Sequence, residues 1–457
     1  MVGALCRGWS CGLVGLAAAL VATAGCNTRH ESPATAASAH SVALPTSAVP
    51  NPAPSPQAAP SANAARAEPS PALVAKAKDL THKFIVLDGH VDLPWRLDES
   101  RDQDGSISED VSHRTPKGDF DWERAREGGL SAPFMSIYVP SKYENAGAKK
   151  IADRLIDMVT GFAQKWPDKF ALAKSPSEVR TNFAAGKVSL AMGMENGSPI
   201  EHDLANVRHF HERGIRYITL THSKDNHISD SSYDEKHTHK GLSDFGKQVV
   251  AEMNRLGIMV DVAHVADDTF WQVMDLSKVP VIASHSSCRH FTPGFQRNVS
   301  DDMLQALAKH KGVIQINFGS GFIDAQAQKQ QDEMRKEVET ILKSKGLDFG
   351  DAKAKPILAE FRASHPHRFA TVEQVADHID HVRKLVGIDH VGLGSDFDGV
   401  GDSLPSGLKD VSQYPNLVRV LLERGYSEQD IEKVCSGNVL RVWQAVEDFA
   451  RTAAPPK

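Results

Sequence analysis

Eight short apolar runs, each long enough for one β-strand, recur between residues 72 and 450 of this 457-residue chain. They span residues 84–87, 133–139, 188–194, 216–220, 258–262, 279–283, 312–317 and 390–394. Helical patterns separate them. In the pattern at 371–387, Thr371 and Gln374 resemble a capping box and Gly387 is a stop signal. Strands that alternate with helices in this way favour an α/β fold.

The number of apolar runs favours a (β/α)8 barrel over a doubly wound open sheet. Eight strands alternating with helices predict a (β/α)8 TIM-type barrel, a fold that tolerates insertions of the size found here. A doubly wound open sheet is the alternative, but the sequence lacks the glycine-rich phosphate loop that is typical of one. We therefore expect a single barrel domain over residues 72–450.

Ionisable residues follow most of the runs. The catalytic residues of a (β/α)8 barrel lie at the C-terminal ends of its strands. The residues that meet this condition are His90, Asp92, Glu195, His222, His264, His285 and Asp396. Each alone has a structural explanation, since His264 could be a hydrogen-bonded structural histidine and Glu195 or Asp396 a cap. Together they predict one functional site at this end of the barrel.

The segment that follows the first run is where this site begins. His90 and Asp92 are two residues apart, and residues at this spacing in a strand share a face. An imidazole and a carboxylate aimed at one point can act as a pair of metal ligands. The spacing therefore favours metal-assisted hydrolysis.

Several separated motifs resemble the membrane (renal) dipeptidase family. In chain order they are Asp88-Gly89-His90-Val91-Asp92-Leu93-Pro94-Trp95, Leu220-Thr221-His222, Gly241-Leu242-Ser243-x-Phe245-Gly246, Asp261-x-Ala263-His264-Val265, Ser284-His285-Ser286-Ser287, Arg297-Asn298-Val299, Gly394-Ser395-Asp396-Phe397-Asp398-Gly399-Val400 and Gly437-Asn438-x-x-Arg441-Val442. The resemblance covers essentially the whole folded part, and it implies a barrel of the metal-dependent hydrolase kind.

The resemblance implies a zinc-dependent dipeptidase with two Zn²⁺ ions per chain. Matched position by position, His90 and Asp92 would bind one zinc. His264 and His285 would bind the other, and Glu195 would bridge both. Imidazole and carboxylate ligands suit Zn²⁺, and two such ions can share a hydroxide. The expected reaction is hydrolysis of the peptide bond of dipeptides through this metal-bridging hydroxide.

The family also implies roles for residues around the metals. His222 would bind the substrate and stabilise the oxyanion, and Glu195 would keep the two ions close together. Asp396 would bind the substrate and transfer a proton from water to the leaving amine. Arg297 would clamp the free C-terminal carboxylate of the substrate with its planar guanidinium. Such a clamp favours dipeptides over longer peptides.

Two stretches depart from the family pattern and bear on substrate preference. They are residues 223–227, Ser-Lys-Asp-Asn-His, and residues 319–322, Gly-Ser-Gly-Phe. A related binuclear metallohydrolase that acts on other amides, β-lactams or lactones is the alternative function. A non-catalytic envelope lipoprotein that only binds a ligand is a third interpretation. The presence of all five proposed metal ligands and of Asp396 argues against it.

The first 26 residues have the pattern of an export signal. Arg7 supplies positive charge, residues 13–22 form an apolar core, and small residues precede Cys26. This resembles a bacterial lipobox and predicts lipidation of Cys26, with an ordinary secretory signal as the alternative. Residues 27–71 are rich in Ala, Pro and Ser and predict a disordered tether. We expect an exported lipoprotein, anchored to a membrane and facing the periplasm or the exterior of a bacterium.

Charge and cysteine content limit the partners of the protein. The net charge of −6 argues against nucleic-acid binding. Cys288 and Cys435 are the cysteines of the folded part, and we expect both to be free and buried. A dipeptide is the expected substrate partner. The sequence leaves open whether the chain forms a homodimer.

A polar stretch at 324–370, rich in Lys, Glu and Gln, separates the seventh and eighth runs. We interpret it as a helical insertion that faces solvent, with a lid over the active site or a dimer contact as the alternative. Residues 451–457 are expected to form a tail. Six histidines in polar stretches are interpreted as surface residues: His209, His211, His237, His239, His365 and His367.

Overall fold

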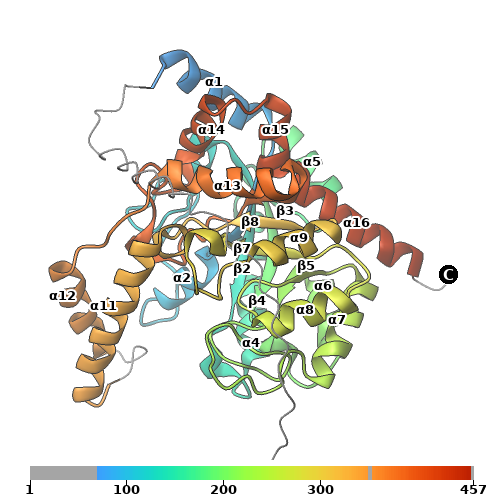
Figure 1. Ribbon diagram of the computed structural model, residues 1–457, viewed down its shortest axis with the longest axis vertical. Helices are drawn as coiled ribbons and strands as arrows, with labels where there is room; N and C mark the ends of the chain where they lie inside the picture. Colours follow the sequence, from blue (N-terminus) through green and yellow to red (C-terminus); the bar gives the residue numbers. More distant parts are fainter. Residues whose placement is uncertain (1–68, 348–352, 454–457) are drawn as a thin grey trace, which may run out of the picture. The chain divides into compact units, whose positions relative to one another are not determined.

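The computed structural model describes residues 69–347 and 353–453 (Figure 1). The predicted export signal, Cys26 and the tether up to residue 68 lie outside the described residues. The strands are β1 (Val86–Val91), β2 (Leu130–Tyr138), β3 (Phe170–Leu172), β4 (Val188–Glu195), β5 (Ile215–Thr219), β6 (Met259–Asp261), β7 (Ile282–Ser286), β8 (Val313–Ile316) and β9 (Val391–Leu393). The helices are α1 (Pro71–Lys83), α2 (Leu93–Glu99), α3 (Trp122–Gly128), α4 (Ala148–Lys165), α5 (Pro176–Ala184), α6 (Ala205–Arg213), α7 (Asp244–Leu256), α8 (Asp267–Leu276), α9 (Asp301–Lys309), α10 (Ser320–Ile323), α11 (Ala325–Ser344), α12 (Ala354–Ser364), α13 (Val372–Val386), α14 (Tyr414–Glu423), α15 (Glu428–Glu432) and α16 (Asn438–Ala453).

A closed parallel barrel forms the centre of the fold. Its strands follow the order β2-β1-β9-β8-β7-β6-β5-β4, and the pairing of β2 with β4 closes the ring. The short strand β3 pairs with β4 outside this ring and was not predicted. Each predicted apolar run overlaps one strand of the ring, and helices lie between successive strands. The predicted (β/α)8 barrel is confirmed.

Three strands extend further along the chain than predicted, and one of them, β4, does so by a single residue, so that it ends at Glu195. β1 pairs with β2 as far as Val91, rather than ending at residue 87, and β7 pairs with β8 as far as Ser286, rather than ending at residue 283. The prediction that His90 and His285 follow their strands is therefore wrong. Both histidines lie inside strands, because the backbone keeps its ladder hydrogen bonds beyond the apolar residues.

Side chains of the strands alternate between the inside and the outside of the barrel. One apolar cluster fills the inside, and it includes Leu87, Phe134, Tyr217, Met259 and Trp443 of α16. The residues next to these strand members along the chain belong to a second, larger cluster that includes the outer helices. This alternation is the period of two that a barrel strand requires.

Aromatic rings connect the inner apolar cluster with the C-terminal ends of the barrel strands. The ring centroids of Trp443 and Phe134 are 5.1 Å apart, as are those of Phe134 and Tyr217. The Tyr217 hydroxyl lies 2.8 Å from Nδ1 of His90 and donates to the carbonyl oxygen of Gly89 at 3.0 Å. The core packing of the barrel therefore continues directly into the region of the predicted site.

The structure confirms two local predictions. Thr371 and Gln374 form a reciprocal capping box at the start of α13, and Gly387 ends that helix. Cys288 and Cys435 are both buried and free. At the other end of the domain, α16 runs to Ala453 and so includes the first residues of the stretch predicted as a tail.

The insertion between β8 and β9 is helical. It consists mainly of α11 and α12, which share a small apolar cluster made of Val338, Leu342, Ala354 and Phe361. Figure 1 shows both helices extending away from the barrel. Most side chains of α11 are exposed, as predicted, but its N-terminal half packs against α10 and brings some of its residues close to the barrel.

The predicted membrane attachment depends on Cys26, which is not among the described residues. Within residues 69–347 and 353–453, no helix has both the length and the apolar character that a membrane span requires.

Gly193 of β4 lies against the ring of Tyr217, and an added Cβ would come within 1.9 Å of the ring atom Cζ. Gly193→Ala should displace Tyr217 and lower the free energy of unfolding by about 1–3 kcal/mol. Gly161→Ala in α4 is the matched control, because the added Cβ meets no atom within 4 Å there and alanine favours a helix. Urea denaturation measures both changes. Equal midpoints for Gly193→Ala and wild type would contradict this packing.

Candidate active site

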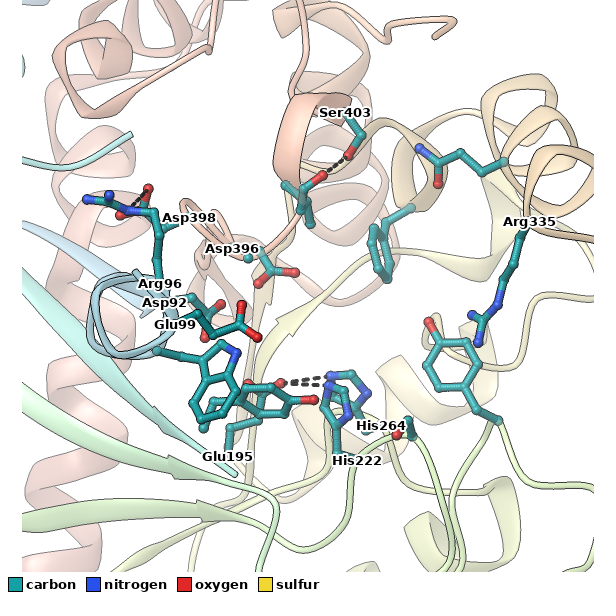
Figure 2. Close-up of a pocket in the computed structure, with 18 of the residues that line it drawn as sticks. Asp92, Arg96, Glu99, Glu195, His222, His264, Arg335, Asp396, Asp398 and Ser403 are labelled. Carbon is teal, nitrogen blue, oxygen red and sulfur yellow. Dashed lines mark hydrogen bonds and ion pairs between the residues drawn. The ribbon is translucent and has the colours of Figure 1, made fainter. Parts of the chain in front are cut away.

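A cavity of about 820 Å³ opens at the C-terminal ends of the barrel strands (Figure 2). Five predicted site residues line it: Asp92, Glu195, His222, His264 and Asp396. They come from different strand ends around the ring, so parallel strands bring residues that are far apart in sequence to one place. The location of the predicted site in the fold is as expected for a (β/α)8 barrel.

Register shifts turn two histidines into the barrel. Strict alternation from the inward Leu87 would point His90 outward, but the pairing of β1 with β2 shifts between Asp88 and Val91. The pairing of β7 with β8 shifts in the same way between Ala283 and Ser286, around His285. An irregularity of this kind re-aims a side chain. The predicted convergence of His90 and Asp92 is correct, but its cause is this shift and not a shared strand face, because Asp92 already lies outside β1.

Glu195 is the centre of the site. Its Oε2 lies 3.3 Å from Nε2 of His90. Its Oε1 lies 3.1 Å from Nε2 of His264, 3.3 Å from Nε2 of His285 and 3.4 Å from Nε2 of His222. The two oxygens of one carboxylate thus face imidazoles on two sides, Oε2 towards His90 and Oε1 towards His264, His285 and His222.

The nitrogen and oxygen atoms around Glu195 are arranged as metal ligands would be. Nε2 of His264 and Nε2 of His285 are 2.9 Å apart, so two lone pairs can converge on one point. On the other side Nε2 of His90 lies 3.3 Å from Oδ2 of Asp92. Within the described part of the chain, Nε2 of His90 and Oδ1 of Asp92 make no hydrogen bond although both are buried. Buried polar atoms of this kind are normally satisfied, and a metal ion would satisfy them.

Hydrogen-bond partners of the Nδ1 atoms fix the orientation of two imidazoles, those of His90 and His285. Nδ1 of His90 is held by Tyr217, and Nδ1 of His285 lies 2.7 Å from the hydroxyl of Ser284. That hydroxyl donates to Oδ2 of Asp261 at 2.6 Å. Partners of this type leave the Nε2 atom of each ring free for a metal and raise its basicity.

Electrostatics keep Glu195 and His264 in the forms that bind a metal. His90 differs, because burial lowers its pKa but Tyr217 and the carboxylates of Asp92 and Glu195 raise that pKa well above its usual value. Burial alone would raise the pKa of Glu195, but His90, His222 and hydrogen bonds from His264 and His285 lower that pKa well below its usual value. Burial, assisted by the charge of Arg297, lowers the pKa of His264 well below its usual value. At neutral pH the carboxylate is therefore ionised and the His264 imidazole is neutral.

Asp396 occupies a constrained position beside the cluster. Its φ of 65° is unusual for a residue other than glycine, and His264 has a φ of 67°. Burial and the neighbouring carboxylate of Asp92 raise the pKa of Asp396 well above its usual value. An added Cβ at Gly399 would lie 2.5 Å from Oδ1 of Asp396 and 2.2 Å from Oδ2 of Asp92, so glycine is needed there.

Arg297 lies beside the cavity. It is only 3% exposed, and its Cζ lies 5.3 Å from the ring centroid of Phe322, which does line the cavity. Nη1 donates to Oγ of Ser286 at 2.7 Å and Nη2 donates to the carbonyl oxygen of His285 at 2.8 Å. Nε has no hydrogen-bond partner among the described residues. The guanidinium thus supports the backbone of a candidate metal ligand and keeps a further donor.

The structure adds a site residue that the sequence analysis missed. Asn317 follows β8, and its Nδ2 donates to Oδ2 of Asp396 at 2.7 Å. Asn317 is the last residue of the predicted run 312–317, so a polar amide side chain at a strand end was the sequence signal for it. The hydrogen bond orients the Asp396 carboxylate.

Two predictions about the outer part of the chain need correction. His367 was interpreted as a surface residue, but it lines the cavity, and of the other five histidines only His237 is exposed while the rest are half-buried. The insertion was interpreted as a solvated segment, yet Gln331 and Arg335 of α11 also line the cavity. The reason is the packing of α11 against α10, which places one side of this polar helix at the rim.

Comparisons of the sequence with known proteins identify its family. The model of the membrane dipeptidase family, peptidase family M19, matches residues 74–457. An uncharacterised dipeptidase of Schizosaccharomyces pombe is 34% identical over 390 residues, covering 82% of this chain and 84% of the relative. Dipeptidase 3 of Mus musculus is 31% identical over 382 residues, covering 82% of this chain and 67% of the relative.

Solved structures agree as well. The probable dipeptidase PvdM of Pseudomonas aeruginosa superposes with a TM-score of 0.71 and 27% identity, covering 83% of this chain and 99% of that chain. A metallopeptidase of Rhodobacter sphaeroides, solved with a phosphinate mimic of the dipeptide L-Ala-D-Ala, gives a TM-score of 0.63 and 25% identity over 79% of this chain and 99% of that chain. The chain therefore belongs to the membrane dipeptidase family and is a metallo-dipeptidase that hydrolyses dipeptides.

Proposed function

We propose that the metal centre of this dipeptidase holds two zinc ions that share Glu195. The observation that carries the proposal is the division of the Glu195 carboxylate, with Oε2 towards His90 and Oε1 towards His264 and His285. In this assignment His90 and Asp92 hold one ion, and His264 and His285 hold the other. Nitrogen and carboxylate donors without sulfur suit a catalytic zinc, which keeps a position open for water.

Bound zinc would supply an activated water molecule and polarise the carbonyl of the scissile bond. The chain's own residues do the remaining work. His222 lines the cavity next to Oε1 of Glu195, where its imidazole can donate a hydrogen bond to the developing oxyanion. Asp396 faces the same space, and Asn317 holds its Oδ2, which leaves Oδ1 for proton transfer to the leaving amine.

Arg297 is proposed to select substrates with a free C-terminal carboxylate. Its guanidinium lies beside Phe322 in the cavity wall, and its Nε donor is available. Burial lowers the pKa values of His222, His264 and His285, and the positive charge of Arg297 adds to this effect at each of them. A carboxylate bound there would place the preceding peptide bond near the metals and leave little room for a longer chain.

We also propose that the protein is exported and lipidated on Cys26. The support is the sequence alone: positive charge at Arg7, the apolar stretch 13–22 and small residues before Cys26. A tether rich in Ala, Pro and Ser would then separate the barrel from the membrane.

Removing the charge of Glu195 tests the metal centre without an activity assay. Glu195→Gln keeps the size of the side chain but cannot neutralise two cations, so the purified variant should retain far less zinc than the two equivalents expected for wild type. Elemental analysis by mass spectrometry measures this. Glu99→Gln is the control, because Glu99 lines the same cavity and forms no ion pair with a histidine in the part of the chain that the structure describes. Wild-type protein that binds no zinc after reconstitution would contradict the proposal.

Blocking the substrate carboxylate tests Arg297. Wild-type enzyme should hydrolyse a dipeptide at least about tenfold faster, in kcat/KM, than the same dipeptide with an amidated C-terminus, because a charge-assisted hydrogen bond is lost. Arg297→Lys should reduce this discrimination. Equal rates for the free and amidated substrates would show that no such clamp exists.

Replacing the Asp396 carboxyl group tests the proton transfer. Asp396→Asn should lower kcat by about 10²–10⁴, because the amide cannot accept and return a proton. Zinc content should stay at the wild-type level, since Asp396 is not a proposed metal ligand, and elemental analysis of the same sample checks this. Near-normal turnover would remove Asp396 from the mechanism.

A further inference from the structure

The insertion brings a positively charged side chain to the active-site cavity. Arg335 of α11 lines the cavity, although most of its helix faces solvent. Figure 2 shows its side chain extending from the helix into the pocket, on the opposite side of the view from Asp92 and Glu99. A guanidinium in this position can contact a bound substrate.

Arg335 is available for a ligand. No hydrogen bond or ion pair joins it to another residue of the described part of the chain. Glu339, one turn along α11, pairs with Lys343 at 2.7 Å, and that hydrogen bond lowers the pKa of Glu339 with a smaller contribution from the charge of Arg335. The other arginine of the cavity differs in this respect, because Arg96 is neutralised by Glu109 at 2.6 Å and by Asp398 at 3.1 Å. Of the two arginines that line the cavity, Arg335 is therefore the one that has no carboxylate at ion-pair distance among the described residues.

Two aromatic residues, Phe322 and Tyr233, line the cavity together with Arg335. Phe322 contacts Arg297, and Tyr233 lines the same wall. Burial raises the pKa of Tyr233, and the charges of Arg297 and Arg335 both oppose this rise, so both guanidiniums act electrostatically on this side chain. A C-terminal residue whose α-carboxylate is held at Arg297 would extend its side chain along these rings towards Arg335.

Other groups at the outer wall would also favour an anion. Lys224 lines the cavity, and its nearest acidic partner, Asp234, is 3.9 Å away. Nδ1 of His367 is buried and has no hydrogen-bond partner among the residues described. The acidic groups that line the cavity without an arginine partner lie elsewhere. Asp92 and Asp396 lie with the proposed metal ligands, and Glu99 lies at the end of α2.

We propose that Arg335 binds a carboxylate on the side chain of the substrate's C-terminal residue, so that dipeptides ending in Asp or Glu are preferred. The direction of the side chain rests on the proposed binding of the α-carboxylate at Arg297. The substrate class follows from this unpaired charge, since a guanidinium pairs with a carboxylate through two parallel hydrogen bonds and gains little from an amide.

The test compares two substrates of equal size. The full-length, zinc-loaded enzyme is assayed with Ala-Glu and Ala-Gln, with the C-terminal residue in both configurations. Wild type should prefer Glu over Gln by at least about tenfold in kcat/KM, mainly through KM. Arg335→Gln should bring this ratio close to one. Lys336→Gln is the matched control, because it removes the same charge from the next position of α11, which does not line the cavity, and it should keep the wild-type ratio.

Binding of the products without turnover separates this proposal from the proposed function. Free glutamate should bind the zinc-loaded protein more tightly than glutamine, measured by calorimetry, and Arg335→Gln should abolish the difference. If that held while no dipeptide was cleaved, the proposed metal chemistry would fail and the role of Arg335 would stand. The role of Arg335 is overturned if wild type does not distinguish Glu from Gln. It is also overturned if Arg335→Gln slows both substrates equally, since this would mean that Arg335 binds the α-carboxylate.

Discussion

The ionised carboxylate of Glu195 is the group on which the active site depends. It is 4% exposed, and a charge buried to this extent is costly unless other charges or donors surround it. Four imidazole nitrogens lie within 3.4 Å of its oxygens and lower its pKa. The same arrangement, with His264 neutral, leaves lone pairs directed at the spaces on either side of the carboxylate, where divalent cations would fit.

Much of the barrel serves to hold these nitrogens in place. The inner aromatic rings end in Tyr217, whose hydroxyl fixes His90, and Gly193 leaves the space that this ring needs. His264 and Asp396 both have positive φ angles, which a folded scaffold must stabilise. Backbone strain, tight packing and buried charge therefore coincide at the C-terminal ends of the barrel strands. The surrounding fold must offset their cost, and in doing so it holds the side chains of the site in fixed positions.

The part of the cavity furthest from the metals has a different origin. Its wall is formed by residues of the insertion and of the loops, including Arg335, His367 and Tyr233. The insertion is separate from the barrel strands, whereas the loop of Tyr233 is tied to the site, because the backbone N–H of Ser232 donates to the carbonyl oxygen of His264 at 2.8 Å.

The sequence by itself determined the fold class and which ionisable residues meet at one end of the barrel. Eight β-rich runs that alternate with helices favour a (β/α)8 barrel, and Glu195, His222, His264 and Asp396 could be found because several ionisable residues follow such runs. The local capping box at Thr371 was equally clear, since it depends on residues three apart.

The tertiary structure alone decided how these residues meet. A period of two would have pointed His90 out of the barrel, and the register shift that reverses it depends on pairing with β2, some forty residues away in the chain. The contacts of Asn317 with Asp396 and of α11 with the cavity likewise join segments that carry no local signal for each other. Alternation and capping are short-range properties that a sequence displays, whereas register and packing between distant segments are fixed only when the barrel closes.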